Sequence, residues 1–341
     1  MIDWPALVRK AVYIGTPNEP MIETVNINKP IGVDTLPTEW EQKLGTYEFQ
    51  TAGAVEVENV DLCGPAMVGF IDGDVVLDTA YFGRIDLWER NKPYFDYAME
   101  ALSTPNKTVS YAVSFANIWS HNYFHWVLDI MPSLEYILTL DERPLILVQQ
   151  NPPDYMTGTL DDLGLAWEEQ QADHYLVERL LVIPTRREKG FVKPSAIRIL
   201  RNFALPTPPV FTSPYIYTSR DDASSRQVVN EEDVVGFLGG FGFHPLQAGK
   251  YDFSAQMGMF SQAREIIGPH GSALANMVWA DAPKVIELVS PEYTNPCCWL
   301  IAAGMGWDYG YVIGEPSDKG HEFIEIDVTK LEQVMEMMEC P

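Results

Sequence analysis

Two arginines follow a strand-like segment in a chain that is otherwise short of positive charge. Arg220 ends the segment YIYTSR, and Arg226 comes after the polar loop DDASS. Two guanidinium groups can hold both phosphates of a nucleotide sugar and neutralise the charge that develops on a departing diphosphate. The alternative is that they form surface ion pairs with the acidic residues around them, which are Asp221, Asp222, Glu231 and Glu232.

A glycine-containing turn occurs in EIIGPHGSALANMVWA, residues 265–280. A buried-type strand is expected to end at Gly268, and a helix to begin near Ser272. Small residues here would let a ligand approach the N–H groups of the helix start, where the helix dipole favours a diphosphate. A plain strand-to-helix turn with a structural histidine is the alternative. The predicted phosphate-binding residues are Gly268, His270, Gly271, Ser272 and Ala273.

Glu287 lies in the next strand-like segment, KVIELVS. An acidic residue at a strand end about twenty residues past a glycine turn is well placed to bind sugar or ribose hydroxyls. We predict that role for Glu287, with a solvent-facing strand residue as the alternative.

The segment SHNYFHWVLDIMPSLEYI carries a possible general base. If it is helical, His121, His125 and Asp129 fall on one face at intervals of four residues. We predict that Asp129, supported by His125, takes the proton of an acceptor hydroxyl. The two residues could also exchange these roles, and the sequence does not decide which of them is the base. His121 is interpreted as a core or cap residue. Asp129 could instead cap or pair locally before Pro132, which is expected to kink or end the helix.

No metal site is predicted. Asp72-Gly73-Asp74 resembles a cation-binding DxD motif, but it lies between apolar runs, as a hairpin turn does. Cys297 and Cys298 are adjacent, have no metal-knuckle spacing and resemble no nucleophile setting, so they are interpreted as packing residues.

The elements that position these residues divide into two parts. Residues 1–205 are expected to form an N-terminal, acceptor-side domain with a hairpin-rich start, and 206–341 a C-terminal domain that binds the nucleotide sugar. The proline-rich stretch from Leu205 to Pro214 is the linker candidate. After it, strands and helices alternate as in a doubly wound parallel sheet, which binds ligands at the carboxyl ends of its strands. A closing helix with an apolar stripe is expected to dock, and could dock back on the N-terminal domain.

Composition restricts the partners and the compartment. The 341 residues include 23 Lys and Arg against 48 Asp and Glu, a formal net charge of −25 that disfavours nucleic acid as a partner. No apolar stretch reaches the roughly 18 to 20 residues of a membrane-spanning helix, and the N-terminus lacks a secretory apolar run. Four cysteines without paired spacing fit a reducing compartment, so a soluble, cytoplasmic protein is expected.

Taken together, the three segments resemble glycosyltransferase family 61, which includes plant arabinoxylan transferases, animal protein O-linked GlcNAc transferases and bacterial capsule-type enzymes. The residues that carry the resemblance are Asn122, His125, Trp126, Asp129, Pro132, Ser219, Arg220, Arg226, Asn230, Glu231, Gly268, His270, Gly271, Asn276 and Glu287.

The resemblance implies a GT-B architecture, in which two Rossmann-like α/β domains face each other across a cleft. The short N-terminal region suggests that its sheet is smaller or more irregular than a complete Rossmann domain. The family further implies an inverting transfer from a nucleotide sugar, with UDP-sugar favoured, to a glycan or other hydroxyl acceptor, with no metal or other cofactor.

Two other functions remain open at this stage. A sugar-nucleotide epimerase shares the doubly wound sheet and the phosphate-binding helix but needs no acceptor. A non-catalytic carbohydrate-binding protein could use the nine tryptophans and sixteen tyrosines to stack against sugars. Release of free nucleotide from nucleotide sugars, measured with and without glycans, would separate the three functions.

Overall fold

A computed structural model describes residues 22–50, 54–76, 79, 92–183, 187–188, 190–203 and 213–341. Contacts divide the chain into unit 1, residues 1–22 and 50–187, and unit 2, residues 23–49 and 188–341. The sequence placed a single domain boundary at 205, whereas this division gives residues 23–49 to the C-terminal unit. Most of the expected linker, residues 205–212, lies outside the described residues.

Unit 1 contains a mixed seven-stranded sheet of order β5-β4-β3-β9-β6-β7-β8. Strands β9, β6, β7 and β8 run parallel, while β3, β4 and β5 extend the sheet by antiparallel pairing. The strands are β3 Val55–Cys63, β4 Val68–Ile71, β5 Asp74–Val76, β6 Lys107–Ser114, β7 Leu145–Val148, β8 Trp167–Glu169 and β9 His174–Val182. The helices are α3 Lys92–Ala101, α4 Tyr123–His125, the π-helix η4 Trp126–Ile130, α5 Met131–Leu138 and α6 Asp154–Asp162.

The hairpin predicted at Asp72-Gly73-Asp74 is confirmed. Strands β4 and β5 pair antiparallel with Ile71 opposite Asp74. Asp72 and Gly73 both have positive φ, 52° and 84°, as the two central residues of a type I′ hairpin turn require. The apparent DxD motif is therefore part of a hairpin turn. The N-terminal sheet is mixed and irregular, as expected.

Unit 2 contains a five-stranded sheet of order β13-β12-β14-β15-β16 in which every pair is parallel. Its strands are β12 Tyr215–Thr218, β13 His244–Leu246, β14 Glu265–Pro269, β15 Lys284–Val289 and β16 Tyr309–Ile313. Its longer helices are α7 Pro194–Arg201, α8 Glu231–Gly239, α9 Phe253–Phe260, the 3₁₀ helix η6 Ser272–Trp279, α10 Cys297–Met305 and α11 Val328–Met337. The parallel α/β sheet predicted for the C-terminal half is confirmed.

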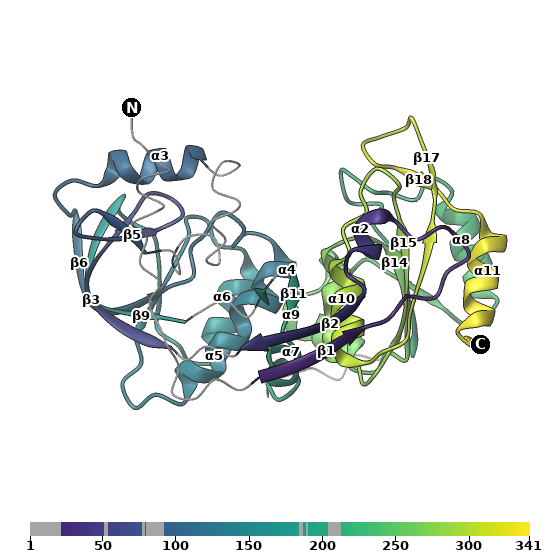
Figure 1. Ribbon diagram of the computed structural model, residues 1–341, viewed down its shortest axis with the longest axis horizontal. Coiled ribbons are helices and arrows are strands. Elements are labelled where there is room, and N and C mark those ends of the chain that lie inside the picture. The colour runs from purple at the N-terminus through teal and green to yellow at the C-terminus, as the bar shows by residue number, and fades with distance from the viewer. Residues whose placement is uncertain are drawn as a thin grey trace. The chain divides into compact units, whose positions relative to one another are not determined.

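The strand order fixes where this sheet can bind a ligand. In unit 2, α8 and α11 contact each other on one side of the sheet, and α9 and α10 lie on the other (Figure 1). The chain steps from β12 outward to β13 and then crosses back to β14, so the order reverses between β12 and β14. Ligands of such sheets bind outside the carboxyl ends of the strands at this switch point.

The closing helix α11 packs within unit 2. Its predicted apolar stripe is confirmed, because Leu331, Val334, Met335 and Met338 are all buried in the same core cluster as Ile286 and Val312 of the sheet. Its main contacts are with β16 and α8 of the same unit. The side chain of Asp327 accepts a hydrogen bond from the Thr329 N–H and caps its start.

Small elements complete the described residues. Three two-stranded sheets pair β1 Ile22–Ile27 with β2 Gly45–Gln50, β10 Arg187–Glu188 with β11 Phe191–Val192, and β17 Glu315–Pro316 with β18 Ile324–Glu325. Helix α2 Thr38–Glu41 carries Trp40, which is fully buried and stacks on Trp299 with ring centroids 5.3 Å apart. The short 3₁₀ helix η5 spans Ala248–Lys250. Trp40 thus anchors an N-terminal segment on the C-terminal unit.

Candidate active site

The possible general base of unit 1 lies in a π-helix. Asn122 caps the start of α4 by accepting from the Phe124 N–H at 2.9 Å, and η4 follows from Trp126 to Ile130 before Pro132 enters the first turn of α5. Single π-turns inside helices occur frequently at functional sites because they re-aim side chains. His121 precedes the helical segment and is exposed, so the expected stripe of three residues is corrected to two.

His125 and Asp129 form a close pair. Nδ1 of His125 lies 2.6 Å from Oδ2 of Asp129, and the Asp129 side chain has no exposed surface while 18% of the His125 side chain is exposed. The imidazole is flanked by the rings of Trp119 and Phe124, each with its centroid 5.7 Å away. A buried carboxylate held by an imidazole that reaches solvent can receive a proton and pass it outward.

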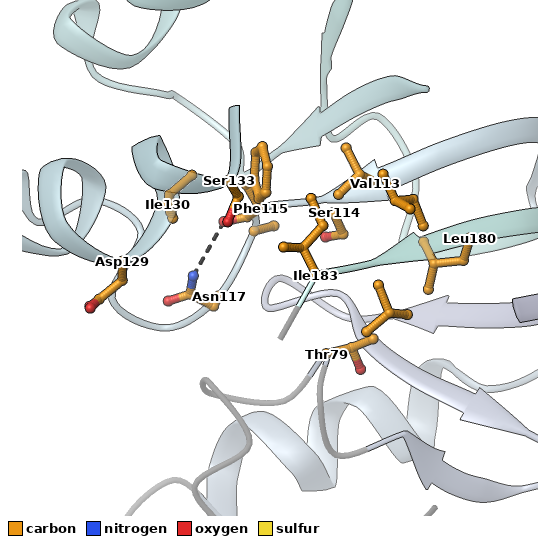
Figure 2. Close-up of a pocket in the computed structure, with 13 residues that line it drawn as sticks. Thr79, Val113, Ser114, Phe115, Asn117, Asp129, Ile130, Ser133, Leu180 and Ile183 are labelled. Carbon is orange, nitrogen blue, oxygen red and sulfur yellow. Dashed lines mark hydrogen bonds between the residues drawn. The ribbon is translucent and has the colours of Figure 1, made fainter. Parts of the chain in front are cut away.

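Asp129 also lines a pocket of unit 1 at the carboxyl ends of β6 and β9. Figure 2 shows Asp129 and Asn117 at one end of this pocket, and Val113 and Leu180 at the other. Asn117 is held by hydrogen bonds to its own loop, from its Nδ2 to the Phe115 carbonyl and from the Trp119 N–H to its Oδ1. Sequence reasoning missed Asn117, although its place just after a strand was a usable signal.

At the switch point of unit 2, the predicted glycines allow close packing of side chains. A Cβ on Gly268 would lie 1.9 Å from Oγ1 of Thr218, and a Cβ on Gly271 would lie 2.0 Å from Nη1 of Arg220. Glycine at 271 therefore lets the Arg220 guanidinium lie against the β14–η6 connection. Packing against Thr218 and Arg220 is thus one reason for glycine at these two positions, and the approach of a ligand stays a prediction.

We predict opposite effects on stability for two glycine substitutions. Gly268→Ala should lower the free energy of unfolding by about 1–3 kcal/mol because it overpacks Thr218. Gly236→Ala should raise it by about 0.5–1 kcal/mol, because this exposed helical glycine of α8 has no atom within 4 Å of an added Cβ. Urea unfolding of both variants measures the effects, and equal stabilities would contradict the packing at the switch point.

Arg220 is a partly buried cation, and its buried Nε atom lacks a partner among the described residues. Nη2 donates to the Ser225 carbonyl at 3.2 Å, whereas the buried Nε has no hydrogen-bond partner among the described residues. Burial, and then the charge of Arg226, lower the pKa of the Arg220 guanidinium. A bound anion would accept a hydrogen bond from the unsatisfied Nε and would offset the repulsion between the two guanidinium groups.

Arg226 is held in a specific position. It adopts a left-handed backbone, φ 56°, its Nε donates to the His270 carbonyl at 3.1 Å, and its Nη1 pairs with Glu322 at 3.0 Å. The guanidinium also lies 4.6 Å from the ring centroid of Tyr293, in a cation–π contact. The ion-pair partner is thus Glu322, far along the chain, and the nearby Glu231 accepts from Tyr217 and Ser219 instead.

The helix expected at Ser272 is a 3₁₀ helix. Gly271 precedes it with extended backbone, and the Leu274 N–H donates to the Gly271 carbonyl at 3.0 Å. Ser272 and Ala273 are partly exposed, while the remaining residues of η6 are buried. Anion binding at this partly exposed first turn stays a prediction.

His270 and Glu287 form a buried pair instead of reaching outward. Glu287 lies opposite Gly268 inside the sheet, is fully buried, contacts Nδ1 of His270 and accepts from the Tyr309 hydroxyl. Burial opposes the charge on His270, but Glu287 and Cys297 outweigh it and raise the pKa of His270 to about 10. Neither role foreseen for Glu287, sugar binding or a solvent-facing position, matches this placement of its side chain.

Cys297 and Cys298 do more than fill space. Sγ of Cys297 lies 4.0 Å from Nε2 of His270 and 4.0 Å from Sγ of Cys298, at the first turn of α10. The Cys298 thiol, more than His270, lowers the pKa of Cys297 against the opposing effect of burial. The interpretation as packing residues alone is corrected; the 27 residues that separate His270 from Cys297 hid this contact from sequence spacing.

Part of the chain is similar to a known protein family. None of the helices in the described part of the chain is both long and apolar enough to cross a bilayer, and no curated protein matches the chain. Residues 123–286 match the family described as Glycosyltransferase 61, a span that contains His125, Asp129, both arginines and the glycine turn, and that ends one residue before Glu287. This region of the chain is similar to glycosyltransferase family 61.

Proposed function

We propose that the chain is an inverting glycosyltransferase that moves a sugar from a nucleotide sugar, a UDP-sugar, to a hydroxyl of a glycan or other acceptor. The observation that carries the proposal is the pair Arg220 and Arg226 at the switch point of the parallel sheet, where Arg220 has an unsatisfied buried Nε. A diphosphate would supply the missing acceptors and counter-charge, and the first turn of η6 would add backbone donors.

The proposed reaction needs one proton acceptor and one stabilised leaving group. The acceptor hydroxyl loses its proton to the Asp129 carboxylate, supported by His125, and its oxygen forms a bond to the anomeric carbon. The bond between that carbon and the diphosphate oxygen breaks, its electron pair stays on the diphosphate, and the two arginines stabilise the added charge. Attack opposite the leaving group inverts the anomeric configuration.

Three further properties belong to this proposal. The two α/β units adopt the GT-B arrangement implied by the family resemblance. No cofactor takes part, because side chains and backbone N–H groups supply the positive charge that a divalent cation provides in other sugar transferases. The reaction takes place in the cytoplasm, where the four cysteines, all free thiols, stay reduced.

The test is incubation of the purified chain with a panel of nucleotide sugars, with and without added glycans, while free nucleotide is measured. We expect one UDP-sugar to release UDP in an acceptor-dependent way, and an equal rate with EDTA present. Isomerised nucleotide sugar without acceptor would identify an epimerase instead, and glycan binding without nucleotide release a non-catalytic carbohydrate-binding protein. Loss of activity in EDTA that manganese or magnesium restores would contradict metal independence.

A further inference from the structure

The cluster of His270, Cys297 and Cys298 has the composition and spacing of a metal-ligand set. Its three ligand atoms, Nε2 and the two Sγ atoms, all lie within 4.8 Å of one another. A tetrahedral zinc ion with Zn–S about 2.3 Å and Zn–N about 2.0–2.1 Å places neighbouring ligand atoms about 3.5–3.8 Å apart. The two measured separations of 4.0 Å are within a few tenths of an ångström of that value.

The surroundings of His270 fix which nitrogen can bind a metal. Nδ1 is engaged by Glu287, whose other carboxylate oxygen accepts from the Tyr309 hydroxyl, so Nε2 is the nitrogen that faces the thiols. A histidine that binds a metal almost always has its second nitrogen on a carboxylate or carbonyl, which orients the ring and increases its basicity. This outer contact is already in place.

The ligand chemistry selects the class of metal. Two thiolates and one imidazole prefer soft or borderline cations such as Zn²⁺ over Mg²⁺ and Ca²⁺, which take oxygen ligands. We propose that His270, Cys297 and Cys298 bind one zinc-class ion, which links the β14–η6 connection to the first turn of α10. Binding displaces the proton at Nε2 and the thiol protons, and the fourth coordination position is taken by solvent.

This site is separate from the divalent cation that sugar transferases hold between diphosphate oxygens. Its ligand atoms are an imidazole nitrogen and two sulfurs, with Cys298 1% and His270 7% exposed, whereas a cation held by a diphosphate takes oxygen ligands. The proposed ion therefore stabilises the fold beside the switch point. Its presence can be measured without sugar transfer, so failure of the transferase proposal and failure of this one are distinguishable.

The experiment uses the full chain, reduced, stripped with a chelator and freed of any histidine tag, titrated with Co²⁺ and then Zn²⁺. We expect one equivalent of Co²⁺ to give a thiolate-to-cobalt charge-transfer band that Zn²⁺ removes, and Zn²⁺ to raise the melting temperature. Cys297→Ser and Cys298→Ser should each weaken binding more than tenfold and abolish the zinc-dependent rise. Cys340→Ser, a partly buried thiol elsewhere in unit 2, should behave as the parent.

Circular dichroism and melting of the metal-free variants separate loss of ligands from loss of fold. A folded Cys298→Ser protein that binds Co²⁺ like the parent would overturn the proposal. So would a parent protein that shows no thiolate band under reducing conditions, or a band that Cys340→Ser removes as fully as Cys297→Ser does.

Discussion

Asp129→Asn should lower the rate of sugar transfer by about 10²- to 10⁴-fold, the contribution of a general base. The substitution keeps the size of the side chain and lets it remain hydrogen-bonded to His125, whose Nδ1 lies 2.6 Å from the carboxylate, while removing basicity. Affinity for the nucleotide should stay near that of the parent. Initial rates at saturating donor and acceptor, with calorimetry of UDP binding, measure both quantities.

The chain supplies a matched control for this substitution. Asp61 and His174 form a second Asp–His pair in unit 1, with Nε2 of His174 2.8 Å from the carboxylate, and Asp61 does not line the pocket that contains Asp129. Asp61→Asn makes the same chemical change and should leave the rate within about threefold of the parent, since no reacting proton passes through it. A rate for Asp129→Asn within tenfold of the parent would exclude this carboxylate as the base and move the role to His125 or elsewhere.

Arg220→Ala and Arg226→Ala should each reduce UDP affinity by about 1.5–3 kcal/mol, roughly 10- to 150-fold, because a charge-assisted hydrogen bond to phosphate is lost. Isothermal titration calorimetry with UDP measures the loss. Arg201→Ala is the control, because Arg201 in α7 of unit 2 pairs with the exposed Asp281 at a site unrelated to the switch point. Unchanged affinity in both test variants would discard the diphosphate site.

Stability separates a binding role from a structural role for Arg220. Its guanidinium is partly buried beside a like charge, and its buried Nε has no hydrogen-bond partner among the described residues. Truncation therefore removes an unfavourable interaction as well as the bond to the Ser225 carbonyl. We expect Arg220→Ala to melt at or above the temperature of the parent while losing affinity. Arg226→Ala should melt at a lower temperature than the parent, because it loses the ion pair with Glu322 and the hydrogen bond to the His270 carbonyl. A large fall in melting temperature for Arg220→Ala would favour a structural role.

Local pattern in the sequence was sufficient for much of the fold. The alternation of strands and helices after residue 213 predicted the parallel sheet, the turn residues at Asp72-Gly73 predicted the hairpin, and the spacing of apolar residues predicted α11. Each of these depends on interactions between residues close in the chain, where periodicity and backbone preference are directly readable. The pairing of His125 with Asp129 was visible for the same reason.

Contacts between residues distant in the chain were decided only by the tertiary structure. Arg226 pairs with Glu322, 96 residues away, and His270 meets Cys297, 27 residues away, because parallel strands bring their carboxyl ends to one edge. The sequence predicted that Glu287 binds sugar or ribose hydroxyls, with a solvent-facing position as the alternative. Strand register instead places it opposite Gly268, buried against His270. Which side chains share a buried space depends on register and crossover connections, and these are set by the packing of the whole sheet.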